Sequence, residues 1–174
     1  MTVEDANTLL LLRHAKSSWR EPALADFERP LSGRGVRDGT RFGPRIARVL
    51  PRPDLVLCSP SRRTRDTLAF LIPELVDPRR VRFEDGLYRA TASELLRYIR
   101  STPPAVRTLL VLAHNPGLTD LANLLPGGDD DALENLPTFG CVRFALTVPF
   151  SELDRGGARL VALLRPKDAP PGEP

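Results

Sequence analysis

The chain has 174 residues, 41% of them hydrophobic, and a formal net charge of +3. This length and composition favour one domain with a substantial buried core. No apolar run approaches the roughly 18 residues that cross a bilayer, and the acidic opening residues argue against a secretory signal. We therefore expect a cytoplasmic protein that has no membrane partner.

The two cysteines and the distribution of charge narrow the function classes further. Cys58 and Cys141 lie far apart and outside any CxxC pattern, which argues against a disulfide framework or a thiolate metal site. The 25 lysines and arginines are spread along the chain, without a dense basic run or interleaved aromatic residues. We therefore expect no nucleic-acid partner, whereas ligands that carry phosphate fit the charge.

Short apolar runs alternate with helical patterns along the chain. The apolar runs, which are too short for an average helix and predict buried strands, are residues 8–12, 54–58 and 108–113. The helical patterns between and after them are residues 32–50, 61–71 and 91–99. Strands that alternate with helices predict parallel βαβ units. Two further strands, at 141–148 and 158–166, are expected to pair antiparallel across a turn at 154–157.

Local signals set the expected helix limits. Ser32 is a candidate N-cap for the first helix, and Thr91 with Glu94 has the spacing of a capping box. Gly43 and Pro44 lie inside the first helical pattern, so we expect a kink there or a split into two helices.

The ordered body is expected to cover residues 8–165. Residues 1–7 are assigned to a flexible N-terminus. Residues 166–174, rich in proline and charge, are assigned to a disordered tail.

Polar side chains follow the three best strand candidates. Arg13 and His14 follow the first; Ser59, Arg62, Arg63 and Arg65 follow the second; His114 and Asn115 follow the third. In an open parallel sheet, ligands bind outside the carboxyl ends of the strands. The chain has only two histidines, and both fall at such ends beside arginines, which favours a site over two separate structural histidines.

This set of residues has the chemistry of a phosphate pocket. Two arginines can hold a phosphoryl group and neutralise the charge that develops on its oxygens. His14 lies between Arg13 and Lys16, which disfavours its protonated form and leaves a free nitrogen to attack phosphorus. His114 has no adjacent cation in the sequence, so we expect it to be protonated and to donate to the phosphoryl oxygens. Arg62 and Arg65 are expected to lie on a solvated helix face.

Four motifs, in this order, resemble the histidine phosphatase superfamily and its short SixA-type phosphohistidine phosphatases. They are LLRHAKSSW from residue 11, RPLSGRG from 29, CSPSRRTRDT from 58 and VLAHNPGL from 111. The resemblance covers about residues 8–165 and implies a phosphoglycerate mutase-like α/β fold. Such a fold is a three-layer sandwich, with a central, mostly parallel sheet flanked by helices. It also implies a catalytic domain that needs no metal or other cofactor.

The resemblance implies roles for individual residues. His14 matches the histidine that becomes phosphorylated, Arg13 and Arg63 match the two pocket arginines, and His114 matches the second histidine. Ser17 falls where the family often places a hydroxyl that contacts phosphate. The remaining candidates for substrate binding are Lys16, Ser59 and Asn115. The implied substrate is a protein that carries phosphohistidine or a small phosphorylated metabolite.

Two positions depart from the family pattern. Ala15 stands where glycine is usual, and Arg89 stands where a general-acid glutamate is expected after a Leu-aromatic pair. Glu84 and Asp85 are the candidates for a substitute acid. A weak acid favours a labile phosphoryl group, because an alcohol leaving from an ester needs a proton more than an imidazole does.

Three rival hypotheses remain open. Cys58 could be a catalytic thiolate, although Thr64 stands where the arginine of a C-x5-R motif belongs. A broad small-molecule phosphatase or phosphomutase shares the same pocket. A phosphate-recognition module could keep the arginines without turnover. Trp19 is expected either to shape the rim of the site or to anchor the core.

Overall fold

The computed structural model describes residues 6–72, 74–128 and 132–168. In this part of the chain, a single sheet has the strand order β3-β2-β4-β1-β5-β6. The strands are β1 (Thr8–Arg13), β2 (Leu55–Cys58), β3 (Val81–Phe83), β4 (Thr108–Ala113), β5 (Cys141–Leu146) and β6 (Ala158–Leu164). The α-helices are α1 (Gly33–Val49), α2 (Arg62–Ala69), α3 (Ala92–Arg100) and α4 (Gly117–Leu124).

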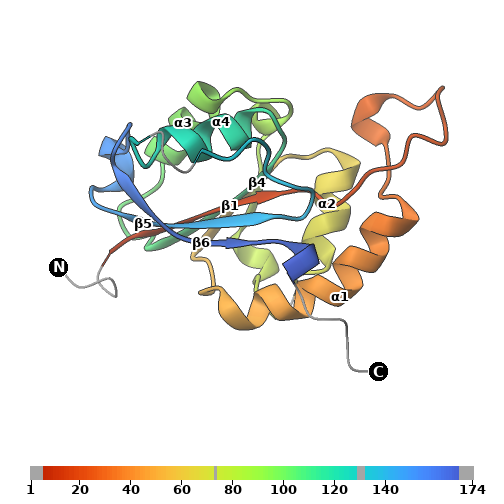
Figure 1. The fold of residues 1–174 in the computed structure, drawn as a ribbon, viewed down its shortest axis with the longest axis horizontal. Coiled ribbons are helices and arrows are strands. Elements are labelled where there is room, and N and C mark those ends of the chain that lie inside the picture. Colours follow the sequence, from red (N-terminus) through yellow and green to blue (C-terminus); the bar gives the residue numbers. More distant parts are fainter. Residues whose placement is uncertain (1–5, 73, 129–131, 169–174) are drawn as a thin grey trace.

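The sheet is mostly parallel and has helices on both faces. β4 pairs parallel with β1 and with β2, and β2 pairs parallel with β3. Among the described strands, β5 has the opposite direction to the rest, because it pairs antiparallel with both β1 and β6. Helices α3 and α4 cover one face of the sheet, and α1 covers the other (Figure 1). The expected three-layer α/β sandwich is confirmed.

The central strands are apolar along their whole length because both of their faces are buried. Along β1, Leu9 and Leu11 point into the core under α3 and α4, whereas Leu10 and Leu12 point into the core under α1. This explains why the sequence shows continuous apolar runs rather than alternation. No helix in the described ranges is both long and apolar enough to cross a membrane.

The predicted elements are present, and two were missed. The strands expected at 8–12, 54–58 and 108–113 and the closing antiparallel pair are confirmed. β3 was missed because it is three residues long and mostly exposed. α4 was missed because it is only eight residues long and directly follows Pro116.

Helix α1 is not split at Gly43 and Pro44, which corrects one of the two alternatives expected there. It runs unbroken from Gly33 to Val49 with Pro44 inside it. A side chain on Gly43 would come within 2.7 Å of the Phe70 carbonyl oxygen. We attribute the unbroken helix to this close packing, which offsets the hydrogen bond that proline cannot donate.

The helix caps are confirmed, and a short helix lies at the start of the predicted tail. The Ser32 hydroxyl accepts from the Gly35 amide at 3.1 Å. Thr91 and Glu94 form the expected capping box. Pro166–Asp168 form a 3-10 helix, in which Arg165 Nε donates to Asp168 Oδ2 at 2.6 Å. These three residues belong to the segment that proline and charge content assigned to the tail; residues 1–5 and 169–174 lie outside the described residues.

We predict that Gly35→Ala destabilises the protein. A β-carbon at Gly35 would overlap the carbonyl oxygen of Lys16, two residues after His14. Overpacking of this kind costs about 1–3 kcal/mol. The measurement is the free energy of unfolding in urea.

Gly33→Ala is the matched control, because the nearest atom to its new β-carbon would be Arg37 Nη1 at 3.5 Å. This variant should be as stable as the parent or slightly more so, by up to about 1 kcal/mol. Equal effects of the two substitutions would contradict the role of the contact between α1 and Lys16.

Candidate active site

The carboxyl ends of three adjacent strands bring both histidines together. β2, β4 and β1 are neighbours in the sheet, with Cys58 opposite Leu112 and Arg13 opposite Ala113. His14 and His114 therefore emerge side by side, and their ring centroids lie 5.1 Å apart with the rings tilted by 55°. The convergence expected from the strand ends is present.

His14 is held as a neutral ring with one defined tautomer. Its Nδ1 lies 2.7 Å from the carbonyl oxygen of Ala15, which can only accept, so Nδ1 carries the hydrogen and Nε2 the lone pair. Burial lowers the pKa of His14 to about 4; the bond to Ala15 opposes this shift, and the charges of Arg63 and Arg13 add to it. The expected neutral nucleophile is thus supported by the surroundings of the ring.

His114 is also neutral, which corrects the protonated state expected from its neighbours in sequence. Burial, together with the coulombic interactions with His14 and Arg63, lowers its pKa to about 3. Burial and these neighbours come from the tertiary fold, so the sequence beside His114 could not show them. Its Nε2 lies 2.8 Å from the hydroxyl of Ser59. Protonation of His114 would need a negatively charged group, such as a phosphoryl group, beside it.

Arg63 is buried in the pocket, and the motif around it ties α2 to the loop of His14. Arg63 is 5% exposed, whereas its neighbour Arg62 is exposed and pairs with Asp66 at 3.9 Å. The Thr67 hydroxyl accepts from the Ala15 amide at 2.9 Å and donates to the Arg63 carbonyl at 2.6 Å. One threonine therefore fixes both the backbone next to His14 and the backbone of Arg63.

Asp26, which the sequence analysis missed, neutralises the arginines. Its Oδ1 accepts from Arg29 Nη1 at 2.7 Å, and its Oδ2 accepts from Arg63 Nη2 at 3.1 Å and from the Tyr88 hydroxyl at 2.6 Å. Its backbone carbonyl also accepts from Arg63 Nη1 at 2.6 Å. These bonds connect the 3-10 helix Asp26–Glu28 to α2 and to the segment before α3.

The protonation states of this cluster follow from its hydrogen bonds. Burial acts to raise the pKa of Asp26, but bonds from Tyr88 and Arg29 and the charge of Arg63 together hold it well below its ordinary value. The pKa of Tyr88 is raised by burial and by its bond to Asp26. The Tyr88 ring meets the His114 ring edge to face, with centroids 5.6 Å apart. Asp26 is therefore ionised and Tyr88 neutral at pH 7.

Arg29 connects the pocket to an exposed aromatic ring. Its Nη2 donates to the Ser17 hydroxyl at 2.7 Å and its Nε to the Ser18 carbonyl at 2.9 Å. Its guanidinium carbon lies 3.2 Å from the centre of the Trp19 ring. Trp19 is 73% exposed, so the expectation that it could anchor the core is wrong. The ring stacks on Arg29 instead.

Arg13 and Asn115 both bind the backbone before β5. Arg13 Nη1 donates to the Leu136 carbonyl at 2.7 Å, and Asn115 Nδ2 donates to the same oxygen at 3.0 Å. The Oδ1 of Asn135 also accepts from Asn115, at 2.7 Å. Burial lowers the pKa of Arg13. The structure thus brings Arg13 to the His14 pocket and shows Asn115 holding the loop beside it.

The other sequence candidates differ in how they relate to the pocket. Lys16 is exposed, and its carbonyl oxygen, rather than its side chain, holds the first turn of α1 through Ser32. Ser59 is fully buried and positions His114. Among the described residues, neither Glu84 nor Asp85 makes a side-chain hydrogen bond or ion pair with any of these site residues. The described ranges also contain no cluster of His, Cys, Asp or Glu arranged to hold a metal ion.

The thiolate hypothesis for Cys58 is not supported by the surroundings of its sulfur. Cys58 is fully buried, and burial raises the pKa of its thiol to about 12. A thiol with such a pKa is protonated at neutral pH and is a poor nucleophile.

Some of the missed residues carried a signal in the sequence. Arg29 lies in the RPLSGRG motif and Tyr88 in the segment DGLYRA, so both were within segments already singled out. Asp26 had no such signal. It reaches the arginines only because the chain between Trp19 and Pro30 folds back over the strand ends.

Comparisons with known proteins agree with this geometry. Residues 9–88 match the model of the histidine phosphatase superfamily, branch 1. The uncharacterised protein Rv1276c of Mycobacterium tuberculosis is 32% identical over 163 residues, which cover 90% of this chain and all of that protein.

Solved structures with the same fold include two SixA proteins. A protein from Nakamurella multipartitia, proposed to be the phosphohistidine phosphatase SixA, superposes with a TM-score of 0.80 and 28% identity over 92% of this chain and 96% of that one. The protein histidine phosphatase SixA complexed with tungstate superposes with a TM-score of 0.74, over 92% of this chain and 98% of that one, at 20% identity. The second likeness shows the fold alone.

The chain belongs to the histidine phosphatase superfamily, and within it to the SixA type. It is an enzyme that hydrolyses phosphoryl groups. Its substrates are phosphorylated molecules.

We predict that the two buried histidines make folding stability depend on pH. Both folded-state pKa values lie below the ordinary value of 6.5, so the unfolded chain binds more protons as the pH falls below that value. The free energy of unfolding should therefore decrease from about pH 7 to about pH 5, above the range where most carboxylates titrate. Urea unfolding across this range measures it.

The matched variant is His14→Asn, which removes one of the two titrating groups. Its free energy of unfolding should change less with pH over the same range. An identical pH dependence in parent and variant would show that His14 is not held neutral in the folded state.

Proposed function

We propose that the enzyme hydrolyses a labile phosphoryl group, that of protein phosphohistidine, through a phosphohistidine intermediate on His14. The observation that carries the proposal is the state of the His14 ring. Its Nδ1 donates to the Ala15 carbonyl at 2.7 Å, and its pKa is lowered to about 4, so Nε2 has a free lone pair at neutral pH. Arg13 and Arg63 supply the positive charge that a phosphoryl group needs.

In the first step, Nε2 of His14 attacks phosphorus and forms a nitrogen–phosphorus bond. The bond between phosphorus and the substrate's nitrogen breaks, and its electron pair stays on the leaving imidazole. That imidazole leaves as a neutral ring when its other nitrogen already carries a proton. The N–H group at Nδ1 of His14 keeps its hydrogen bond to the Ala15 carbonyl oxygen, and this bond stabilises the positive charge that the ring gains.

In the second step, water attacks the phosphorus of the intermediate. The electron pair of the nitrogen–phosphorus bond returns to Nε2 of His14, and the proton lost by the water passes to solvent. His114, held by Ser59 at 2.8 Å, gains a proton more easily once a phosphoryl dianion lies beside it. In that state it donates to the phosphoryl oxygens and offsets their charge.

The available acids favour phosphohistidine over a simple phosphomonoester. An alkoxide leaving group needs a proton, and Asp26 cannot supply one because its pKa is lowered and it already accepts from Arg29, Arg63 and Tyr88. The candidates Glu84 and Asp85 have no described contact with the histidines. A leaving imidazole does not need such an acid. This argument also weighs against a broad small-molecule phosphatase or a phosphomutase.

The rim of the site favours a protein substrate. Trp19 presents an aromatic face that is 73% exposed and is held in place by Arg29, which itself contacts the pocket residues Ser17 and Asp26. A rigid exposed aromatic ring is a typical anchor in protein interfaces. Both cysteines are free and buried, which supports the cytoplasmic location expected from the sequence.

We predict that turnover places phosphate on His14. A phosphoramidate bond is stable in base and labile in acid, so quenching in base should preserve the adduct for peptide mapping by mass spectrometry. His14→Ala should abolish the adduct and still bind vanadate, because the arginines remain.

Phosphate mapped to His114 would reverse the two roles. No adduct on either histidine, together with no turnover of any labile phosphoryl donor, would favour the phosphate-recognition module instead. Such a module would use the arginines for binding without chemistry.

We predict that Arg63→Ala lowers both vanadate affinity and turnover by about tenfold or more, since a charge-assisted hydrogen bond contributes about 1.5–3 kcal/mol. Arg62→Ala is the matched control, because this adjacent arginine is exposed and pairs only with Asp66 on its own helix. Equal losses in the two variants, measured by isothermal titration and steady-state kinetics, would contradict the assignment of Arg63.

A further inference from the structure

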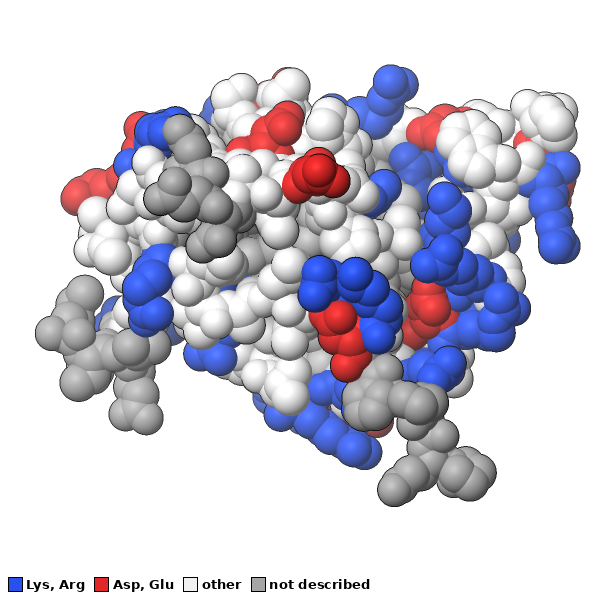
Figure 2. All heavy atoms as spheres, viewed as in Figure 1, with Lys and Arg blue, Asp and Glu red and all other residues white. Residues whose placement is uncertain are grey.

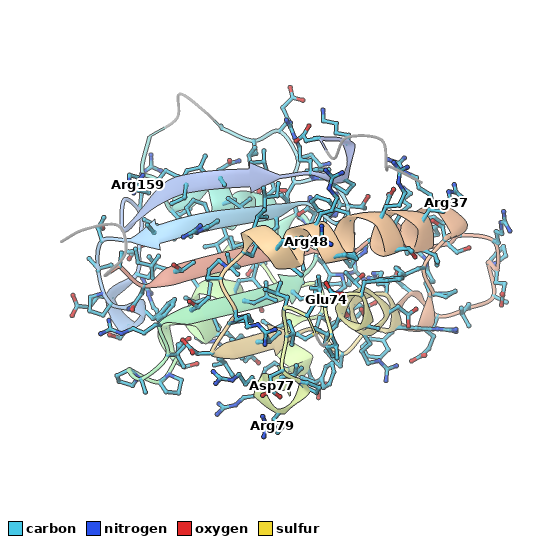
Figure 3. The ribbon with its side chains drawn as sticks, turned by 90° about the horizontal axis from the view of Figure 1, so that it is seen from below. Arg37, Arg48, Glu74, Asp77, Arg79 and Arg159 are labelled. Carbon is cyan, nitrogen blue, oxygen red and sulfur yellow. The ribbon has the colours of Figure 1, made fainter. Side chains whose placement is uncertain are left out.

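One side of α1 carries a stripe of arginines. They follow one another at intervals of three or four residues, so they lie along the same side of the helix. The stripe consists of Arg34, Arg37, Arg41, Arg45 and Arg48. Except for the half-buried Arg45, its members are exposed. Figure 3 labels Arg37 and Arg48 near the two ends of the helix.

The stripe lies opposite the side of α1 that packs on the sheet. The buried side contains Gly35, Gly39, Phe42, Gly43 and Ile46. Asp38 is the acidic residue of α1, and it pairs with Arg34 at 3.5 Å. Figure 2 shows Lys and Arg side chains gathered at the lower right, over the N-terminal half of α1, with few acidic side chains among them.

The stripe begins at the active site. Ser32, the N-cap of α1, donates from its backbone amide to the Lys16 carbonyl at 2.8 Å, two residues after His14. The stripe runs from Arg34 to Arg48, so at the usual rise of about 1.5 Å per residue it extends about 21 Å away from the pocket. A macromolecule that places a phosphoryl group at His14 can therefore also contact the arginines of α1.

Like charges at this spacing weaken a helix. Neighbouring arginines three or four residues apart repel one another and destabilise the helix. Acidic groups from outside would remove this repulsion and add attraction that is strongest at low salt.

We propose that the arginine stripe of α1 docks an acidic protein surface next to the phosphohistidine that the active site hydrolyses. The inference rests on the proposed function, because it takes the phosphorylated histidine as the point where the partner enters the pocket. A nucleic acid would match the charge of the stripe, but its phosphodiesters lack the labile nitrogen–phosphorus bond that suits the pocket. An acidic protein matches both.

The test compares two phosphohistidine peptides of equal length. One has aspartate and glutamate on both sides of the phosphohistidine, and the other has serine and glutamine at the same positions. The enzyme variant is Arg37→Glu/Arg41→Glu, and potassium phosphoramidate serves as a small substrate that cannot reach the stripe. The matched control is Arg82→Glu/Arg97→Glu, which reverses two exposed arginines on β3 and α3.

The parent enzyme should have a kcat/KM at least about fivefold higher for the acidic peptide, through a lower KM that rises with salt. The Arg37→Glu/Arg41→Glu variant should lose this preference and keep its activity on phosphoramidate, whereas the control should keep both. A preference for the acidic peptide that survives in the variant would overturn the docking site and leave the proposed function intact.

A binding experiment tests the docking site even if no substrate is turned over. In the His14→Ala background, fluorescence anisotropy measures the affinity of each peptide, of a 20-nucleotide RNA and of anionic phospholipid vesicles, with and without the two reversals. If Arg37→Glu/Arg41→Glu lowers the affinity for the acidic peptide, the result supports the docking site. Reversal that weakens only RNA or vesicle binding overturns it in favour of that partner.

Discussion

The hydrogen bond from Nδ1 of His14 to the Ala15 carbonyl determines the chemistry of this site. A neutral imidazole can place its lone pair on either nitrogen, and this bond commits it to Nε2. The bond in turn depends on Thr67, which accepts from the Ala15 amide and so fixes the same peptide segment. Burial, aided by the arginines nearby, disfavours a proton on the ring, so Nε2 keeps a free lone pair at neutral pH.

The positive charges of Arg29 and Arg63 need a negatively charged partner, and Asp26 provides it. Arg29 and Arg63 are almost fully buried, and buried cations are costly unless they are paired and hydrogen-bonded. The Asp26 carboxylate bonds to both, yet each guanidinium has five N–H donors, so the pairing uses only part of their capacity. The cluster therefore stays folded as a unit and still has donors to offer a phosphoryl group.

Sequence reasoning predicted the strands and site residues that a local residue pattern indicates. It missed the features that depend on contacts between segments far apart in the chain. The strands of the sheet core and the positions of Arg13, His14, Arg63 and His114 followed from apolar runs and the polar residues after them. The neutral state of His114 did not, because its pKa is lowered first by burial and then by His14 and Arg63, which the fold brings from distant parts of the chain. No sequence pattern indicated Asp26 for a similar reason, since its partners Arg63 and Tyr88 lie 37 and 62 positions away in the chain.

Helix α1 connects the fold to the chemistry through its two sides. Its glycines let it approach Phe70 and the Lys16 backbone closely, so any shift of the helix moves the loop that carries His14. Its other side bears arginines that face solvent. A partner bound along those arginines would contact the same helix that packs against the Lys16 backbone, two residues after His14. If a partner docks on the arginines as proposed, it would act on the geometry of His14 through this helix, because closely packed interiors transmit strain.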